Sequence, residues 1–234
     1  MTIAYLDSRI ADVIPVCGRI PHRTMRIGKW ILVALNWMFF APAHANVAQL
    51  FEAVRQNDLK TVQQLLARGF EVNSTDPNGL SLLMEAARTG HLAIAEHLVK
   101  QKANVNLRNE RGESAVMLAA FHGHEPIVRL LHKAGAELAN PGWTPLHYAA
   151  FNGHQAVCDY LVGVGVPIDD RTPNGSTALM LAARQGHLSV VKFLLAVRAD
   201  ANLSNENGVT ALGMATQNKH PEIAKLLRDA GSKK

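Results

Sequence analysis

Residues 142–154 read GWTPLHYAAFNGH, and looser copies of this segment recur along most of the chain. The glycine that opens the segment has a counterpart at the same place in four other copies. These glycines are Gly79, Gly112, Gly142, Gly175 and Gly208, and their successive spacings are 33, 30, 33 and 33 residues. A fixed period of this length is typical of a protein that stacks one small structural unit many times.

Two further markers share the same period. Pairs of alanines stand at Ala86-Ala87, Ala119-Ala120, Ala149-Ala150 and Ala182-Ala183. A glycine followed by a histidine stands at Gly90-His91, Gly123-His124, Gly153-His154 and Gly186-His187, and Lys219-His220 continues the series. Several independent markers in one register indicate that internal repeats organise the chain from residue 46 onward.

Each copy has the pattern of two short helices joined by turns. A serine or threonine that can cap the first helix stands at Ser81, Ser114, Thr144, Thr177 and Thr210. The alanine pairs let neighbouring helices approach closely, and the glycine of each Gly-His step tolerates the left-handed backbone that ends a helix. Leucine pairs give the second helix a buried stripe, at Leu65-Leu66, Leu130-Leu131, Leu194-Leu195 and Leu226-Leu227.

The segment at 142–154 resembles the signature of the ankyrin repeat family almost residue for residue. Other copies are looser, since Ser81–Met84 and Thr177–Met180 lack the proline and histidine of Thr144–His147. The resemblance implies an all-α fold, a solenoid of helix-turn-helix units with hairpin-like loops. It implies about six repeats, at residues 46–75, 76–108, 109–140, 141–171, 172–204 and 205–234.

Two departures from the repeat have structural consequences. The glycine that ends the second helix is replaced by Lys102 and Arg198 in two repeats and is present at Gly69, Gly135, Gly165 and Gly231. If these two residues keep a positive φ angle, each costs about 1 kcal/mol relative to glycine. The 30-residue spacing also predicts that the loop between Ala136 and Trp143 lacks three residues, which would leave a notch in the middle of the array.

The N-terminal part of the chain has the pattern of an export signal over residues 25–45. Positive charges at Arg26 and Lys29 precede an apolar run from Trp30 to Phe40, and small residues follow at Ala43-His44-Ala45. A positive start, a short apolar stretch and a small-residue cleavage site are the parts of a secretory signal peptide. We therefore expect cleavage near Ala45 and a periplasmic or secreted protein with no stable membrane insertion after cleavage.

Two alternatives to a cleaved signal stay open: a membrane anchor at residues 27–45, or an apolar first helix of the fold. Residues 1–24 are unusual upstream of such a signal, so Met25 is a candidate start and the first stretch a misannotated extension. Cys17 lies before the signal, and the remaining Cys158 cannot form an internal disulfide on its own. We interpret Cys158 as a small apolar residue of an outer helix.

The net charge of +5 is concentrated at the N-terminus. From residue 46 onward, nineteen basic and seventeen acidic residues remain, a net charge of +2. So small an excess gives no reason to expect a nucleic-acid partner.

The repeated histidines invite a catalytic or metal-binding interpretation. They are His91, His124, His154, His187 and His220. Successive stacked helices lie about 8–10 Å apart, too far for equivalent histidines to share one ion. The family resemblance implies that these histidines hold loops by hydrogen bonds, and His122 with His124 is interpreted as a surface pair. No nucleophile elbow, phosphate-binding glycine loop or zinc-protease helix follows residue 45. We expect no enzyme activity, cofactor or metal.

The strongest functional pattern lies beside the alanine pairs, on the face that the first helices leave open. This concave face carries an aromatic and leucine-rich centre with arginines at its edges: Leu118, Phe121, Trp143, Tyr148, Phe151 and Leu181, flanked by Arg88 and Arg184. Aromatic residues with arginine are typical of interface hot spots. The alternative is that these side chains pack against the next repeat and expose little surface.

These patterns together predict a monomeric, non-enzymatic scaffold that binds or protects a partner protein through its concave face and loop tips. A second hypothesis is an inhibitor or immunity-like partner of an enzyme. A third is a protein that binds a small ligand or metal through its histidines. The partner itself is unidentified, because repeat proteins of one scaffold vary their surfaces.

Overall fold

The computed structural model describes residues 43–139 and 142–231, which form helices and loops without a β-strand. The first helices of the repeats are α2 (Ala43–Arg55), α4 (Leu82–Thr89), α6 (Ala115–Phe121), α8 (Pro145–Phe151), α10 (Ala178–Gln185) and α12 (Ala211–Gln217). The second helices are α3 (Leu59–Ala67), α5 (Leu92–Lys100), α7 (Glu125–Lys133), α9 (Gln155–Gly163), α11 (Leu188–Ala196) and α13 (Pro221–Asp229). The predicted all-α solenoid is confirmed.

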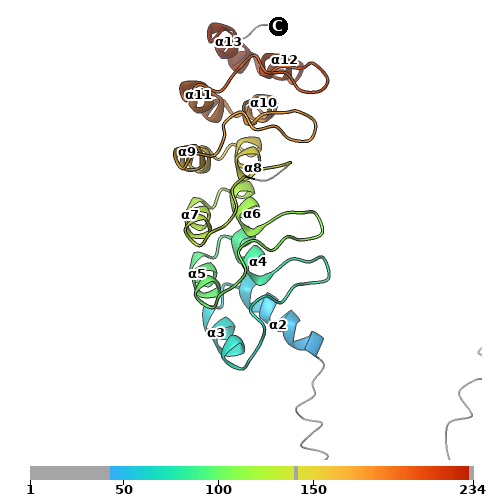
Figure 1. The fold of residues 1–234 in the computed structure, drawn as a ribbon, viewed down its shortest axis with the longest axis vertical. Helices are drawn as coiled ribbons and strands as arrows, with labels where there is room; N and C mark the ends of the chain where they lie inside the picture. Colours follow the sequence, from blue (N-terminus) through green and yellow to red (C-terminus); the bar gives the residue numbers. More distant parts are fainter. Residues whose placement is uncertain (1–42, 140–141, 232–234) are drawn as a thin grey trace, which may run out of the picture. The chain divides into compact units, whose positions relative to one another are not determined.

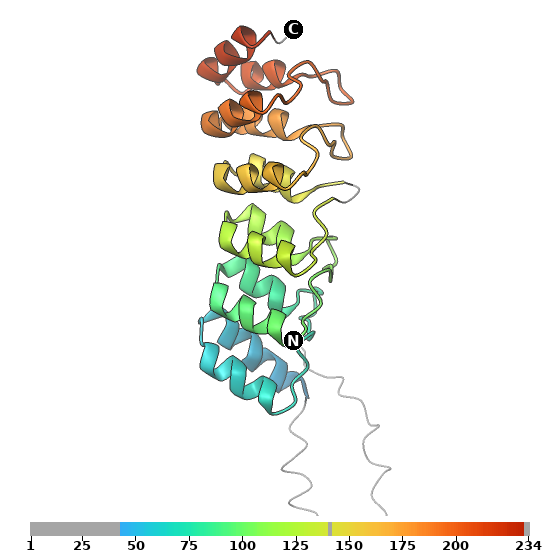
Figure 2. The same cartoon turned by 60° about the vertical axis from the view of Figure 1, so that its left-hand side comes forward.

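The helix pairs stack in two columns (Figure 1). The even-numbered inner helices lie next to the long loops, which we call fingers, and the odd-numbered outer helices lie on the other side. Figure 2 shows the same stack turned, with one helix pair above another. The main helix contacts join the two helices of one repeat or equivalent helices of adjacent repeats, as in α4 with α6 and α5 with α7. Contacts of this kind are local along the array.

The inner helices begin at the predicted caps. The side-chain oxygens of Ser81, Thr144, Thr177 and Thr210 accept a hydrogen bond from the backbone N–H three residues later. The hydroxyl of Ser114 is buried and has no partner among the described residues. Pro145 occupies the first turn of α8, where its missing N–H costs no helical hydrogen bond.

The core includes the alanine pairs and one leucine of each leucine pair. Both members of all four alanine pairs are buried. Leu65, Leu131, Leu194 and Leu227 are buried, whereas their leucine neighbours are half-buried. Because alanine side chains are small, the inner helices pack closely, and the outer helices close the core from the other side.

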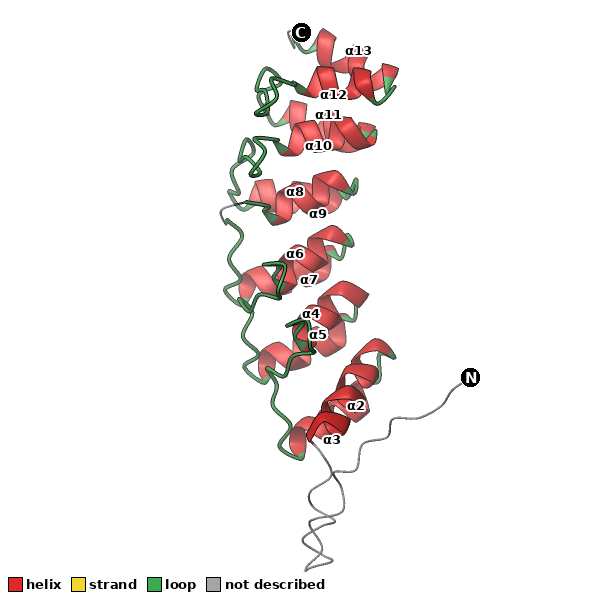
Figure 3. Cartoon of the chain, turned by 90° about the vertical axis from the view of Figure 1, so that its right-hand side faces the viewer, coloured by secondary structure: helices red, strands yellow, loops and turns green. Residues whose placement is uncertain are grey.

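The fingers project from one side of the stack (Figure 3). Fourteen residues connect α5 to α6, since α5 ends at Lys100 and α6 begins at Ala115. Only eleven connect α7, which ends at Lys133, to α8, which begins at Pro145. The predicted short finger before the fourth repeat is therefore present.

The glycines of the Gly-His steps have the expected left-handed backbone, and their lack of a side chain also leaves room for a histidine ring of the next repeat. Gly90, Gly123, Gly153 and Gly186 have φ angles of 81°, 76°, 80° and 84°. A Cβ atom at any of these glycines would lie within 2.7 Å of the histidine ring of the following repeat. Lys219, in the last repeat, also has a positive φ, and no described helix follows its repeat.

The predicted signal peptide lies almost entirely outside the described residues, as do residues 1–24 and Cys17. The expected cleavage after Ala45 falls in the first turn of α2. In the described part of the chain, no helix is both long and apolar enough to cross a membrane. Cys158 is fully buried, and this burial raises the pKa of its thiol to about 12, as expected for an apolar filler in α9.

Candidate functional site

The candidate site is built on the last residues of the inner helices. Arg88, Phe121, Phe151 and Arg184 occupy the same position in successive repeats. The backbone carbonyl of each accepts a hydrogen bond from the Nε2 atom of the next repeat's histidine. The donors are His124 at 3.3 Å, His154 at 3.0 Å, His187 at 2.9 Å and His220 at 3.1 Å.

These hydrogen bonds bear out the loop-holding role that the resemblance implies for the repeated histidines. Because a carbonyl only accepts, the Nε2 atom carries the proton and is not available as a metal ligand. Among the described residues, no group of three or more histidine, cysteine or carboxylate side chains is placed to hold a metal ion. The bonds also fix the backbone from which the concave-face side chains project.

Four of the predicted residues form one aromatic cluster: Phe121, Trp143, Tyr148 and Phe151. The Phe121 and Tyr148 rings meet edge to face with centroids 5.9 Å apart, which joins α6 to α8. The ring centroid of Trp143, in the short finger, lies 5.1 Å from that of Tyr148 and 5.9 Å from that of Phe151. Aromatic pairs at these separations are mutually stabilising.

The aromatic cluster is half-buried rather than fully exposed. All four side chains have intermediate exposure, and Tyr148 packs partly against the core. Burial, and to a lesser extent the charge of Glu113, raises the pKa of the Tyr148 phenol. The cluster is thus a fixed apolar surface whose rings support each other.

Leu118 and Leu181 contribute little area to this open surface. They are 8% and 3% exposed, so Leu181 offers almost no contact area, whereas Leu118 still lines a hollow of the same face together with Arg88 and Phe121. The alternative considered from the sequence applies to both. Their register places them one helical turn before Phe121 and Arg184, where neighbouring inner helices already cover them.

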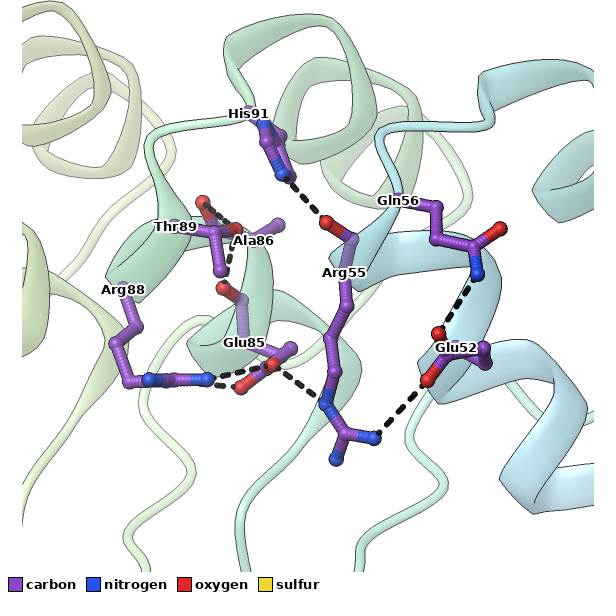
Figure 4. Close-up of polar contacts among 8 residues, drawn as sticks. All are labelled: Glu52, Arg55, Gln56, Glu85, Ala86, Arg88, Thr89 and His91. Atoms are coloured by element: carbon purple, nitrogen blue, oxygen red, sulfur yellow. Dashed lines mark hydrogen bonds and ion pairs between the residues drawn. The ribbon is translucent and has the colours of Figure 1, made fainter.

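Arg88 reaches the concave face but is held there by an ion pair (Figure 4). Its Nε and Nη2 atoms donate to the two carboxylate oxygens of Glu85, at 3.0 and 2.8 Å. Arg55 of α2 donates to the same carboxylate from its Nε atom at 3.0 Å. Glu85 is 0% exposed, and its hydrogen bonds raise the pKa of Arg88.

This ion pair was missed from the sequence. Glu85 and Arg88 lie three residues apart on one helix, but the contact of Glu85 with Arg55 spans two repeats and is not visible in either repeat alone. The 33-residue spacing from Arg55 to Arg88 is the signal that could have found it, because residues in register stack on neighbouring inner helices.

A hollow of about 570 Å³ lies beside the aromatic cluster, between the fingers of the second and third repeats. Its lining includes Arg88, Arg111, Glu113, Phe121 and His122. Partial burial, together with the nearby His124 and Arg88, keeps the pKa of His122 below its ordinary value. The His122 and His124 rings stack with centroids 6.1 Å apart, as a surface pair.

Arg184 stands apart from the aromatic cluster, one repeat further along. It is exposed, and Leu181 takes the place that Glu85 has next to Arg88. In the part of the chain that the structure describes, the Arg184 guanidinium makes no hydrogen bond or ion pair. The two predicted edge arginines therefore differ: one is neutralised within the chain and the other is not.

Comparisons with known proteins agree with the architecture. A family model described as ankyrin repeats, in three copies, matches residues 50–141, 97–172 and 164–234. The crystal structure of the human ASB11 ankyrin repeat domain is similar, with a TM-score of 0.75 and 30% sequence identity. That match covers 79% of this chain and 84% of the ASB11 chain. No protein of curated function matches the chain significantly by sequence.

Proposed function

Because the chain belongs to the ankyrin repeat family, whose repeats generally mediate protein–protein interaction, we propose that it binds a partner protein through its concave face. Family members are typically non-enzymatic scaffolds. The contact is centred on the aromatic cluster of the third and fourth repeats, and Arg88 and Arg184 form its edges. The loop tips on either side add further contacts, and the notch at the short finger admits the partner.

The aromatic cluster carries this proposal. Large rings in fixed positions bury much area at little cost in side-chain entropy, and such residues dominate the binding energy of many interfaces. Here the rings contact each other edge to face, and the backbone of Phe121 and Phe151 is held by His154 and His187. The cluster is therefore preorganised, and its half-exposed rings leave apolar area for a partner to cover.

The binding test is an affinity capture with the full chain from the cells that make it. The double variant Phe121→Ala/Phe151→Ala should lose the captured partner. Phe193→Ala is the matched control, because Phe193 is also half-buried but lies on the outer helix α11. A partner retained by the double variant, or lost equally from the control, would contradict binding at the aromatic cluster.

The proposal includes export to the periplasm after removal of residues 25–45. This part rests on the charged, apolar and small-residue pattern that precedes Asn46. Intact-mass analysis of the protein from its native compartment tests it. A mature N-terminus at Asn46 in the periplasmic fraction is expected, whereas an uncleaved chain in the membrane fraction would instead support the anchor at residues 27–45.

A further inference from the structure

Two hollows of the concave face occupy equivalent places in the array. The larger one, next to Arg88, lies between the fingers of the second and third repeats. The other has a volume of about 360 Å³, includes Arg184, and lies between the fingers of the fifth and sixth repeats. Arg88 and Arg184 hold the same register position on α4 and α10. The chain thus contains the same arginine-lined hollow twice.

The two hollows differ in how the arginine charge is balanced. At Arg88 the chain supplies its own carboxylate, the buried Glu85, which accepts two hydrogen bonds from the guanidinium. At Arg184 the equivalent residue is Leu181, which has no acceptor. No aspartate or glutamate lines this second hollow among the described residues. Arg184 therefore occupies the same position as Arg88, but the described part of the chain provides no carboxylate to pair with it.

The rest of the second hollow offers hydrogen-bond donors. Asn174 and Asn205, one from each finger, use their side-chain oxygens as acceptors within the fingers. The Oδ1 atom of Asn205 accepts from the backbone N–H groups of Asn207 and Val209, at 3.0 and 2.9 Å. The Oδ1 atom of Asn174 accepts from the Thr172 hydroxyl at 2.6 Å. Both asparagines line the hollow together with Arg184, and their amide NH₂ groups are left as donors.

We propose that the Arg184 hollow binds an acidic side chain of the partner protein, so that the partner supplies the carboxylate that Glu85 supplies to Arg88. Arginine pairs with a carboxylate through two parallel hydrogen bonds, and amide donors strengthen such a site. The hollow contains one formal positive charge, which matches the single negative charge of aspartate or glutamate better than a phosphate dianion. This inference deepens the proposed function and rests on it.

The position of Arg184 also limits the spacing of the partner's residues. Phe151 and Arg184 lie in adjacent repeats, on α8 and α10, which pack together. Stacked helices are separated by about 8–10 Å, and an extended chain advances about 3.3 Å per residue. A partner segment with an apolar residue on the aromatic cluster would place its acidic residue about three positions away.

The proposal is tested with small probes on the ¹⁵N-labelled full chain. N-acetylglutamate amide provides one side-chain carboxylate, and N-acetylglutamine amide is its neutral isostere. We expect the glutamate probe to shift the Nε–H resonance of Arg184 in a saturable manner and to leave that of Arg88 unchanged. A response to both probes alike, equal shifts at both arginines, or no saturable shift would overturn the proposal. A stronger response to inorganic phosphate would replace the carboxylate site with a phosphate site.

Two variants separate this site from general electrostatics. Leu181→Glu gives Arg184 an internal carboxylate, as at Arg88, and should abolish the shift caused by the glutamate probe. Arg184→Gln should abolish binding of the glutamate probe without adding a buried charge. The test therefore remains decisive even if Leu181→Glu fails to fold. Retained acid binding in a folded Arg184→Gln variant would overturn the assignment.

Failure of this inference can be distinguished from failure of the proposed function. In the capture experiment, Arg184→Gln should weaken partner binding, whereas Phe121→Ala/Phe151→Ala should abolish it. If the aromatic variant loses the partner and Arg184→Gln binds it unchanged, the proposed function stands and the acidic contact is wrong. If the glutamate probe binds at Arg184 but the aromatic variant still captures its partner, the carboxylate site stands and the proposed binding surface is wrong.

Discussion

Lys102 and Arg198 have φ angles of 65° and 69°, where equivalent repeats have glycine. A side chain with a Cβ atom is strained in this left-handed conformation by about 1 kcal/mol. We therefore expect Lys102→Gly to increase the free energy of unfolding by about 1 kcal/mol. The urea midpoint of unfolding should rise accordingly. Lys102→Ala is the control, because it removes the charge but keeps the Cβ atom. A midpoint for the glycine variant that is no higher than that of the alanine variant would contradict the strain argument.

His147 connects the cap of α8 to the next finger. Its Nδ1 atom accepts from the backbone N–H of Thr144 at 3.0 Å, and its Nε2 atom donates to the Asp170 carbonyl at 2.9 Å. His147 as a whole is 1% exposed. Burial is the main reason that the pKa of His147 is lower than its ordinary value of 6.5. A proton on Nδ1 would also oppose the Thr144 N–H, so the folded chain holds this histidine neutral.

A lowered pKa in the folded state makes stability depend on pH in a defined direction. Below pH 6.5 the unfolded chain binds a proton at His147 before the folded chain does. This contribution to stability is therefore complete above pH 6.5 and is lost as the pH falls toward the folded pKa. We expect His147→Met to reduce the fall in the urea midpoint between neutral and mildly acidic pH. Methionine is the matched choice, since Met84, Met117 and Met180 hold the equivalent positions. An identical pH profile in both chains would contradict this role.

At the scale of helices and fingers, Glu85 links two repeats through its ion pairs with Arg55 of α2 and Arg88 of α4. A buried carboxylate needs such partners, but a well-packed apolar residue can replace it at little cost. We expect Glu85→Gln to lower the free energy of unfolding by about 1–3 kcal/mol, because the amide has no charge and one acceptor oxygen is replaced by an NH₂ group that faces a guanidinium. Glu85→Leu should stay within about 1 kcal/mol of the parent chain, as Leu118 and Leu181 stand at this position in other repeats. Equal losses from both variants in urea unfolding would show that the stack requires the carboxylate itself.

Most of the elements could be predicted from the sequence, because each repeat carries its own caps, glycines and leucine stripe. Thr144 and Pro145 begin α8, for example, and Gly153 ends its turn without any contribution from distant residues. The short finger followed from the 30-residue spacing alone. Local chemistry of this kind repeats at a fixed period, so it is visible in a single sequence.

The burial and the contacts of the side chains at the candidate site could not be predicted from the sequence as well as the helices could. Register placed Leu118, Leu181 and Arg88 on the concave face, but their burial and pairing depend on the neighbouring repeat. Leu181 is covered, and Arg88 is bound to a carboxylate that also binds Arg55. The sequence predicted Phe121, Trp143, Tyr148 and Phe151 for one face, but it gave no sign of the ring contacts that Trp143 of the shortened finger makes with Tyr148 and Phe151.

At the scale of the whole array, the junction between the third and fourth repeats should control cooperativity. The main contacts among the described helices join adjacent repeats, so the first three repeats and the last three are coupled chiefly through this junction. Gly123 lies there, and a Cβ atom at this residue would be 2.5 Å from the Nδ1 atom of His154. Gly123→Ala should therefore displace the ring that holds the Phe121 carbonyl, in addition to straining the backbone.

We expect Gly123→Ala to divide unfolding into two steps, with different urea midpoints for the two halves. Gly112→Ala is the matched control: its φ of 75° gives the same strain, but no atom lies within 4 Å of the added methyl group. That variant should lose about 1 kcal/mol and keep one transition. Hydrogen exchange resolved by repeat measures the difference, since a weakened junction lets one half exchange while the other stays protected. A single sharp transition for Gly123→Ala, with protection lost evenly across all repeats, would mean that coupling passes through the outer helices α7 and α9 rather than through the histidine contact.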